Sequence, residues 1–164
     1  MDTEFEFHVW QPLCAVTVGP FTVTPFPVNH PCPEPYALRV EYRGPSGTEV
    51  LTYSGDTDAC DELVEAARDA DLFLCEAAYQ EGREDGLRGI HLTGRRAGET
   101  AVAAGARRLL LTHLPVWNSP ETVEAEAAAV YDGSVEVTRV NRRYDVARPT
   151  ERSVDALAPA GADD

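Results

Sequence analysis

The chain has 164 residues, of which 43% are hydrophobic, and this predicts one globular domain with its own core. Its net charge of −14 argues against a protein that grips the phosphate backbone of nucleic acids. The first residues are acidic, and no run approaches the roughly 20 apolar residues of a membrane span, so we expect a cytoplasmic protein without a membrane segment.

Two residue types leave alternatives open. The cysteines form no C-x-x-C pair, and we expect them to be reduced thiols. Some arginines could form a local basic patch, although solvated charges on helices and strand edges are the favoured interpretation. These residues are Cys14, Cys32, Cys60 and Cys75, and Arg95, Arg96, Arg107 and Arg108.

The first fifty residues read as an antiparallel β region. Apolar and polar residues alternate over 5–10, and further strands are predicted over 16–18, 21–28 and 36–42. Turn-forming glycine and proline residues separate these segments, with a clear turn over 44–47.

The remainder alternates strands and helices. Apolar runs predict strands, helical spacing and capping residues predict helices, and the order is β-α-β-α-β-α-β. The segments are strands over 49–53, 72–75, 109–111 and 135–137, and helices over 60–70, 94–104 and 119–131. Such alternation implies a largely parallel sheet with right-handed crossovers, hence an α/β fold. We expect residues 1–146 to form the domain and 147–164 to be a disordered tail.

Polar residues with metal-binding chemistry stand where the apolar strands stop. Asp56, Glu76 and His113 each follow a strand of the parallel region, His30 ends an earlier β segment, and His91 precedes a helix. The carboxyl ends of parallel strands share one edge, so these side chains should converge there. Imidazole and carboxylate groups suit Zn²⁺ and similar ions. Singly, each is more often a structural residue, and the coincidence after successive strands carries the hypothesis.

Four sequence blocks add a resemblance. In order, and with similar spacing, they resemble motifs of the metallo-β-lactamase superfamily, and the ribonuclease Z branch is the most similar. The blocks are Tyr53-Ser54-Gly55-Asp56-Thr57, Cys75-Glu76-Ala77-Ala78-Tyr79, His91-Leu92-Thr93 and Leu110-Leu111-Thr112-His113-Leu114. The family fold is a four-layer αβ/βα sandwich of two similar halves, and the chain resembles its C-terminal half.

The resemblance also implies roles. Asp56 resembles the carboxylate that bridges two metal ions, His30 a ligand of the first and His113 a ligand of the second. His91 with Glu76 resembles the acid/base pair that assists the leaving group. The implied activity is hydrolysis of an ester or phosphodiester bond with two zinc ions.

One family motif has no counterpart. The sequence His-x-His-x-Asp-His does not occur, so we expect an incomplete two-metal site and weak or absent metal binding by this truncated chain. The stretch between His30 and Asp56 is too short for a large tRNA-gripping insertion, which favours a small substrate. The alternative is a non-catalytic α/β module that binds a partner, including a second copy, through an exposed sheet face.

Overall fold

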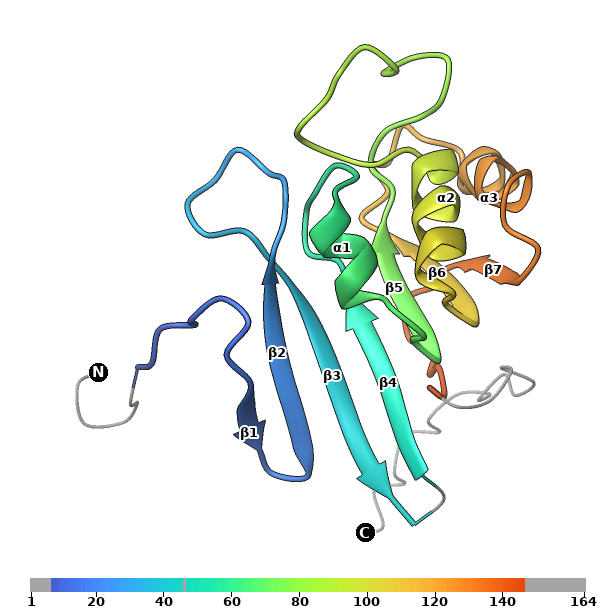
Figure 1. Ribbon diagram of the computed structural model, residues 1–164. Coiled ribbons are helices and arrows are strands. Elements are labelled where there is room, and N and C mark those ends of the chain that lie inside the picture. Colours follow the sequence, from blue (N-terminus) through green and yellow to red (C-terminus); the bar gives the residue numbers. More distant parts are fainter. Residues whose placement is uncertain (1–6, 46, 147–164) are drawn as a thin grey trace, which may run out of the picture.

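The computed structural model describes residues 7–45 and 47–146. Within these residues one seven-stranded sheet runs in the spatial order β1-β2-β3-β4-β5-β6-β7, so every strand lies beside its neighbour in sequence (Figure 1). The first three pairings are antiparallel and the last three are parallel. The α/β fold and the change from antiparallel to parallel strands are therefore confirmed.

The antiparallel half agrees with the sequence except at its start. Its strands are β1 (Val16–Val18), β2 (Phe21–Pro27), β3 (Tyr36–Gly44) and β4 (Gly47–Tyr53). The strand expected over 5–10 is wrong over its described part, because residues 7–10 form no regular structure. Phe7 is 81% exposed. Alternation of apolar and polar residues therefore does not by itself determine a strand.

The parallel half explains the position of the helices. It comprises β5 (Leu72–Glu76), β6 (Arg108–Thr112) and β7 (Ser134–Val137), connected through α1 (Asp61–Ala66), α2 (Gly94–Ala104) and α3 (Pro120–Ala128). Each crossover adds the next strand in the same direction across the sheet. Right-handed connections of this kind place successive helices on one face, as Figure 1 shows.

Local signals account for the helix ends. The Thr93 side chain accepts a hydrogen bond from the Arg96 N–H at the start of α2, and Gly105 ends that helix at φ 66°. α1 is shorter than its predicted range. The Arg39 guanidinium from β3 donates to the Ala66 carbonyl oxygen. A side chain far away in sequence thus hydrogen-bonds to the carbonyl group of the last residue of α1.

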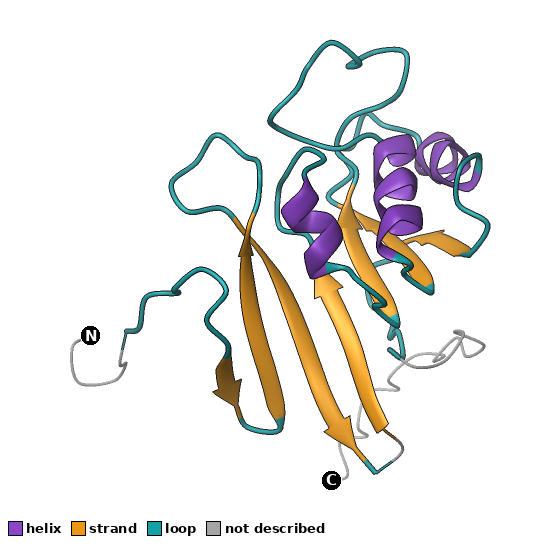
Figure 2. Ribbon diagram, in the orientation of Figure 1, coloured by secondary structure: helices purple, strands orange, loops and turns teal. Residues whose placement is uncertain are grey.

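The core lies between the helices and the sheet. Phe73 of β5 and Leu109 of β6 are fully buried there. Glycine allows α2 and α3 to pack closely, because a Cβ at Gly94 would lie 2.2 Å from the Val123 carbonyl oxygen. No described helix has the length and hydropathy needed to cross a membrane. The loops that follow β5 and β6 gather at one edge of the sheet (Figure 2).

Candidate metal centre

The predicted site residues lie on separate loops at the carboxyl edge of the sheet. Asp56 follows β4, His113 follows β6 directly, and His91 lies between β5 and α2. His30 follows β2, whose last residue is Pro27. The sheet brings these loops together because strands β4, β5 and β6 are parallel and adjacent.

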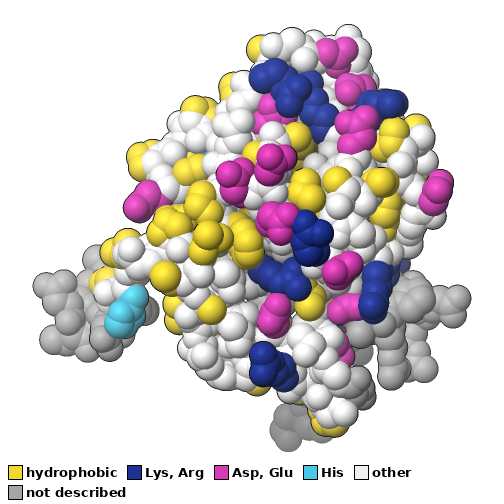
Figure 3. Space-filling view, viewed as in Figure 1, with side chains coloured by type: hydrophobic (Ala, Val, Ile, Leu, Met, Phe, Trp, Pro, Cys, Tyr) yellow, Lys and Arg dark blue, Asp and Glu magenta, His cyan; other side chains and the backbone are white. Residues whose placement is uncertain are grey.

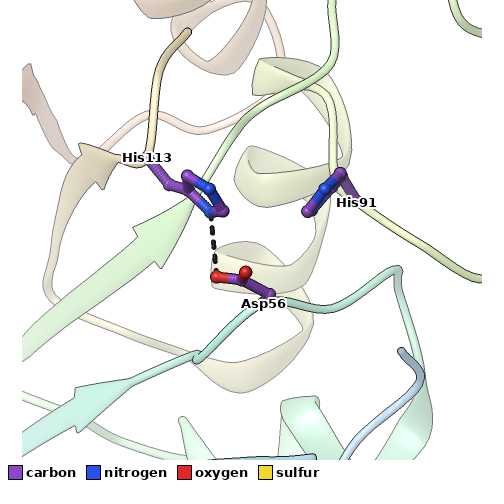
Figure 4. A group of neighbouring side chains, drawn as sticks. All are labelled: Asp56, His91 and His113. Carbon is purple, nitrogen blue, oxygen red and sulfur yellow. Dashed lines mark ion pairs between the residues drawn. The ribbon is translucent and has the colours of Figure 1, made fainter. Parts of the chain in front are cut away.

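Three of these side chains converge closely. Asp56, His91 and His113 each offer one ligand atom, and these atoms lie within 4.8 Å of one another. The His113 Nδ1 atom lies 2.8 Å from Asp56 Oδ1, and Figure 4 shows the Asp56 carboxylate pointing towards the His113 ring, with the His91 ring on the other side of the group. The His91 and His113 ring centroids are 5.2 Å apart. These donors come from three loops, which is how a metal site is commonly assembled.

His30 stands beside this group. Its ring centroid lies 5.2 Å from that of His91, and its Nδ1 atom lies 2.9 Å from the Ile90 carbonyl oxygen. A carbonyl oxygen only accepts, so this contact assigns the proton to Nδ1 and leaves Nε2 with its lone pair. Metal-bound histidines commonly make this type of contact with their second nitrogen. All the histidines expected at the site are therefore gathered at one edge.

The Glu76 side chain connects the loops that follow β4 and β5. Its carboxylate is fully buried at the end of β5. Oε1 lies 2.7 Å from His91 Nδ1 and accepts from the Thr57 N–H, while Oε2 accepts from the Ala78 and Leu92 N–H groups. Burial raises the pKa of Glu76, and these hydrogen bonds oppose that rise. The carboxylate fixes the His91 proton on Nδ1 and so aims Nε2 at the cluster.

Two backbone features shape the loops. His113 adopts φ 61°, a conformation that costs energy for a residue with a Cβ and turns the chain sharply after β6. Gly55 adopts φ 61°, and a Cβ there would lie 2.5 Å from the Tyr36 carbonyl oxygen. Glycine is therefore required immediately before Asp56.

The residue types fit a divalent cation such as zinc. Imidazole nitrogen and carboxylate oxygen are common zinc ligands, and the His91 ring is held by a buried carboxylate as ligating histidines often are. The Asp56 and His113 side chains are each 41% exposed, so a small molecule can reach them. Tyr79 packs its ring edge-on to His91 at 5.1 Å and limits where that ring can move.

Comparison with known proteins supports this picture. A family model described as the beta-lactamase superfamily domain matches residues 3–114, which is more than half of the chain. The chain belongs to the beta-lactamase superfamily. Its relatives in this superfamily include Rv1339 of Mycobacterium tuberculosis, 44% identical over 144 residues, which are 88% of this chain and 51% of that protein.

Two further relatives link the superfamily to hydrolases. YhfI of Bacillus subtilis, named a probable metallo-hydrolase, is 33% identical over 132 residues, or 79% of this chain and 51% of that protein. The YhfI crystal structure has a metallo-beta-lactamase fold and superposes with a TM-score of 0.70 at 32% identity, covering 79% of this chain and 52% of that one. Ribonuclease Z of Myxococcus xanthus is 41% identical over 90 residues, covering 53% of this chain and 29% of the enzyme.

The relationship to ribonuclease Z and the superfamily assignment are thus confirmed, while the individual roles of the site residues stay predictions. The chain spans about half the length of Rv1339 and YhfI. The limits of the domain, 1–146, also stay a prediction, and the tail expected over 147–164 lies outside the described residues.

One buried carboxylate beside the site was not predicted from the sequence. Asp58, two residues after Asp56, is 1% exposed and accepts hydrogen bonds from Arg88 Nε and the Gly89 N–H. The signal was present as a second acidic residue in the same strand-end turn. Two arginines of the basic patch considered above have their charge balanced by a carboxylate. Arg95 pairs with Glu99, and Arg107 pairs with Asp71. Figure 3 shows basic and acidic side chains interspersed on this face.

Proposed function

We propose that this protein is a metal-dependent hydrolase, with zinc as the metal, that cleaves an ester or phosphodiester bond in a small substrate. The observation that carries the proposal is the approach of the Asp56, His91 and His113 side chains, whose nitrogen and oxygen atoms lie within 4.8 Å of one another. This places two proposed metal ligands, Asp56 and His113, beside a histidine that can transfer a proton. Superfamily membership and the likeness to YhfI, a named metallo-hydrolase, support it.

The ligands in this proposal come from three loops. His30, Asp56 and His113 would hold the metal. A bound zinc ion supplies an acidified water and polarises the substrate oxygen. Asp56 is the carboxylate among these ligands, and it already pairs with His113 at 2.8 Å.

His91 performs the proton transfer. Its Nδ1 proton is fixed by Glu76 at 2.7 Å, so Nε2 is the atom that takes or gives a proton at the leaving group. The carboxylate orients the ring. The His91 side chain is 19% exposed, and the ring is therefore screened from bulk water without being sealed off.

The substrate class follows from the relatives and the charge. Ribonuclease Z of Myxococcus xanthus, whose name specifies RNA cleavage, matches over 53% of this chain, which favours a phosphodiester. The net charge of −14 disfavours a long nucleic acid, because a polyanion would be repelled. A small phosphodiester is therefore the preferred substrate, and a simple ester is the second choice.

Metal binding and turnover test the proposal separately. Isothermal titration with Zn²⁺ should show weak binding, because the His-x-His-x-Asp-His motif does not occur in this sequence. This binding should be abolished in Asp56→Ala and retained in His8→Ala, since His8 is an exposed histidine outside the cluster. The rate enhancement over the uncatalysed reaction should be larger for bis(4-nitrophenyl) phosphate than for 4-nitrophenyl acetate. His91→Ala should impair hydrolysis of a phosphodiester with an alkoxide leaving group, which needs a proton, more than hydrolysis of bis(4-nitrophenyl) phosphate, whose nitrophenolate leaves without one. If Zn²⁺ binds the wild type and Asp56→Ala equally, the proposed centre is wrong.

The alternative is a partner-binding module without catalysis. Phe21 of β2 lies on the sheet face away from the helices, because side chains alternate along a strand and Phe26 packs on the core under them. Phe21 is 42% exposed and its neighbour Val18 is 55% exposed. A protein that binds no metal and self-associates through this face would favour the alternative.

A further inference from the structure

The loop over residues 77–93 has to hold His91 accurately, although it contains neither a helix nor a strand beyond one isolated bridge. Long irregular loops are usually mobile unless side chains tie them down. His91 lies near the end of this loop, and the preceding residue, Ile90, supplies the carbonyl oxygen that contacts His30. The position of two site rings therefore depends on residues 88–91.

Asp58 is the buried group that ties this segment down. Its Oδ2 atom accepts from the Gly89 N–H at 2.7 Å and from Arg88 Nε at 2.6 Å, while Oδ1 accepts from its neighbour's N–H. The Asp58 N–H donates to the Asn29 carbonyl oxygen at 2.9 Å. One residue thus joins the loop before His30, the loop of Asp56 and the loop of His91.

Arg96 holds the same loop from the side of α2. It is 8% exposed, and its guanidinium donates to the Leu87 and Asp85 carbonyl oxygens at 3.3 and 2.9 Å. Its Nη1 atom lies 3.6 Å from Asp58 Oδ1. The buried Asp58 carboxylate therefore has cations on two sides, Arg88 and Arg96. Burial raises the pKa of Asp58, but the hydrogen bonds from Arg88, Gly89 and Ala59 bring it below its usual value.

We propose that Asp58 is a positioning residue for the metal centre, an inference that rests on the proposed function. Through Gly89 it fixes the segment that carries His91 and the carbonyl group that orients His30. Asp58 is not among the residues whose ligand atoms converge, so it acts through the loop and not as a ligand. Without the Asp58 carboxylate, the rings of His30 and His91 should adopt more than one orientation.

A matched residue makes the test sharp. Asp71 also accepts from a backbone N–H, that of Val50 at 2.9 Å, and from an arginine, Arg107 Nη1 at 2.6 Å. It is 9% exposed and precedes β5, whereas the metal centre lies beyond the other end of that strand. Asp58→Asn and Asp71→Asn therefore remove the same kinds of bond at opposite ends of the sheet.

Zn²⁺ titration of both variants is the first measurement. Disturbing a group that orients metal ligands lowers affinity by about 10- to 100-fold, and we expect this for Asp58→Asn. Asp71→Asn should bind Zn²⁺ like the wild type. Equal affinity of the two variants would overturn the proposal and leave the metal centre itself in place.

The second measurement uses the metal-free protein. Ring ¹⁵N shifts should show one His91 tautomer, protonated on Nδ1, in the wild type and in Asp71→Asn, and a mixture of tautomers in Asp58→Asn. If Asp58→Asn gives the same spectrum as the wild type, the positioning role is wrong, whether or not the wild type binds Zn²⁺. Failure of the wild type to bind Zn²⁺ would count against the proposed function alone. If Asp58→Asn does not fold, Arg88→Gln tests the same contact with Arg107→Gln as control, because both arginines are more than half exposed.

Discussion

Replacing Glu76 by glutamine should destabilise the protein and move the His91 ring proton from Nδ1 to Nε2. Each carboxylate oxygen of Glu76 faces two donors: Thr57 N–H and His91 Nδ1 on Oε1, and Ala78 N–H and Leu92 N–H on Oε2. A glutamine amide has one acceptor oxygen and one NH₂ group, so in either orientation the NH₂ meets two donors. The change therefore leaves buried donors without an acceptor.

The less costly orientation is clear from these contacts. With NH₂ on the Oε2 side, two backbone N–H groups lose their acceptor, at about 1–3 kcal/mol each. With NH₂ on the Oε1 side, the imidazole of His91 can move its proton to Nε2 and accept through Nδ1, and only the Thr57 N–H loses its partner. We therefore expect Glu76→Gln to lower the free energy of unfolding by about 1–3 kcal/mol.

Urea unfolding and ring ¹⁵N shifts of His91 measure the two effects. Glu124→Gln is the control, because Glu124 uses Oε2 for the single Val137 N–H and a glutamine oxygen can replace it. The variant should also lose turnover that needs His91 Nε2 as a proton acceptor, since that atom would then carry the proton. Stability within about 0.5 kcal/mol of the wild type, with the His91 proton still on Nδ1, would refute the reasoning.

Two further results are expected. Gly55→Ala should lower stability in thermal unfolding more than Gly19→Ala. Both residues have positive φ, which costs about 1–2 kcal/mol for alanine, but only the Gly55 Cβ would strike a backbone oxygen, that of Tyr36 at 2.5 Å. Equal losses would show that the backbone moves aside. An aromatic disulfide reagent should modify exposed Cys14 rapidly and spare Cys75 in the folded protein, because burial raises the pKa of the Cys75 thiol and excludes the reagent. Fast modification of Cys75 would indicate an opening of the core.

Short-range signals determined much of the fold. Thr93 and Gly105 mark the ends of α2, and Ser119 with Pro120 marks the start of α3, because capping depends on residues a few positions apart. The alternation of buried strands and helices fixed the parallel half, and strand ends pointed to the residues of the candidate site. The strand predicted over 5–10 is absent over its described part, because the alternation of apolar and polar residues does not by itself determine a strand.

The tertiary structure alone decided how the site is arranged. The sequence placed Glu76 near His91, but only the folded chain shows that this buried carboxylate accepts from loops after β4 and β5 and thereby fixes a tautomer. It also revealed Asp58, whose partners at Arg88 and Gly89 are 30 and 31 residues away. Such contacts depend on strand register and on the direction of each side chain, and these are set by packing across the whole sheet, which no stretch of neighbouring residues encodes.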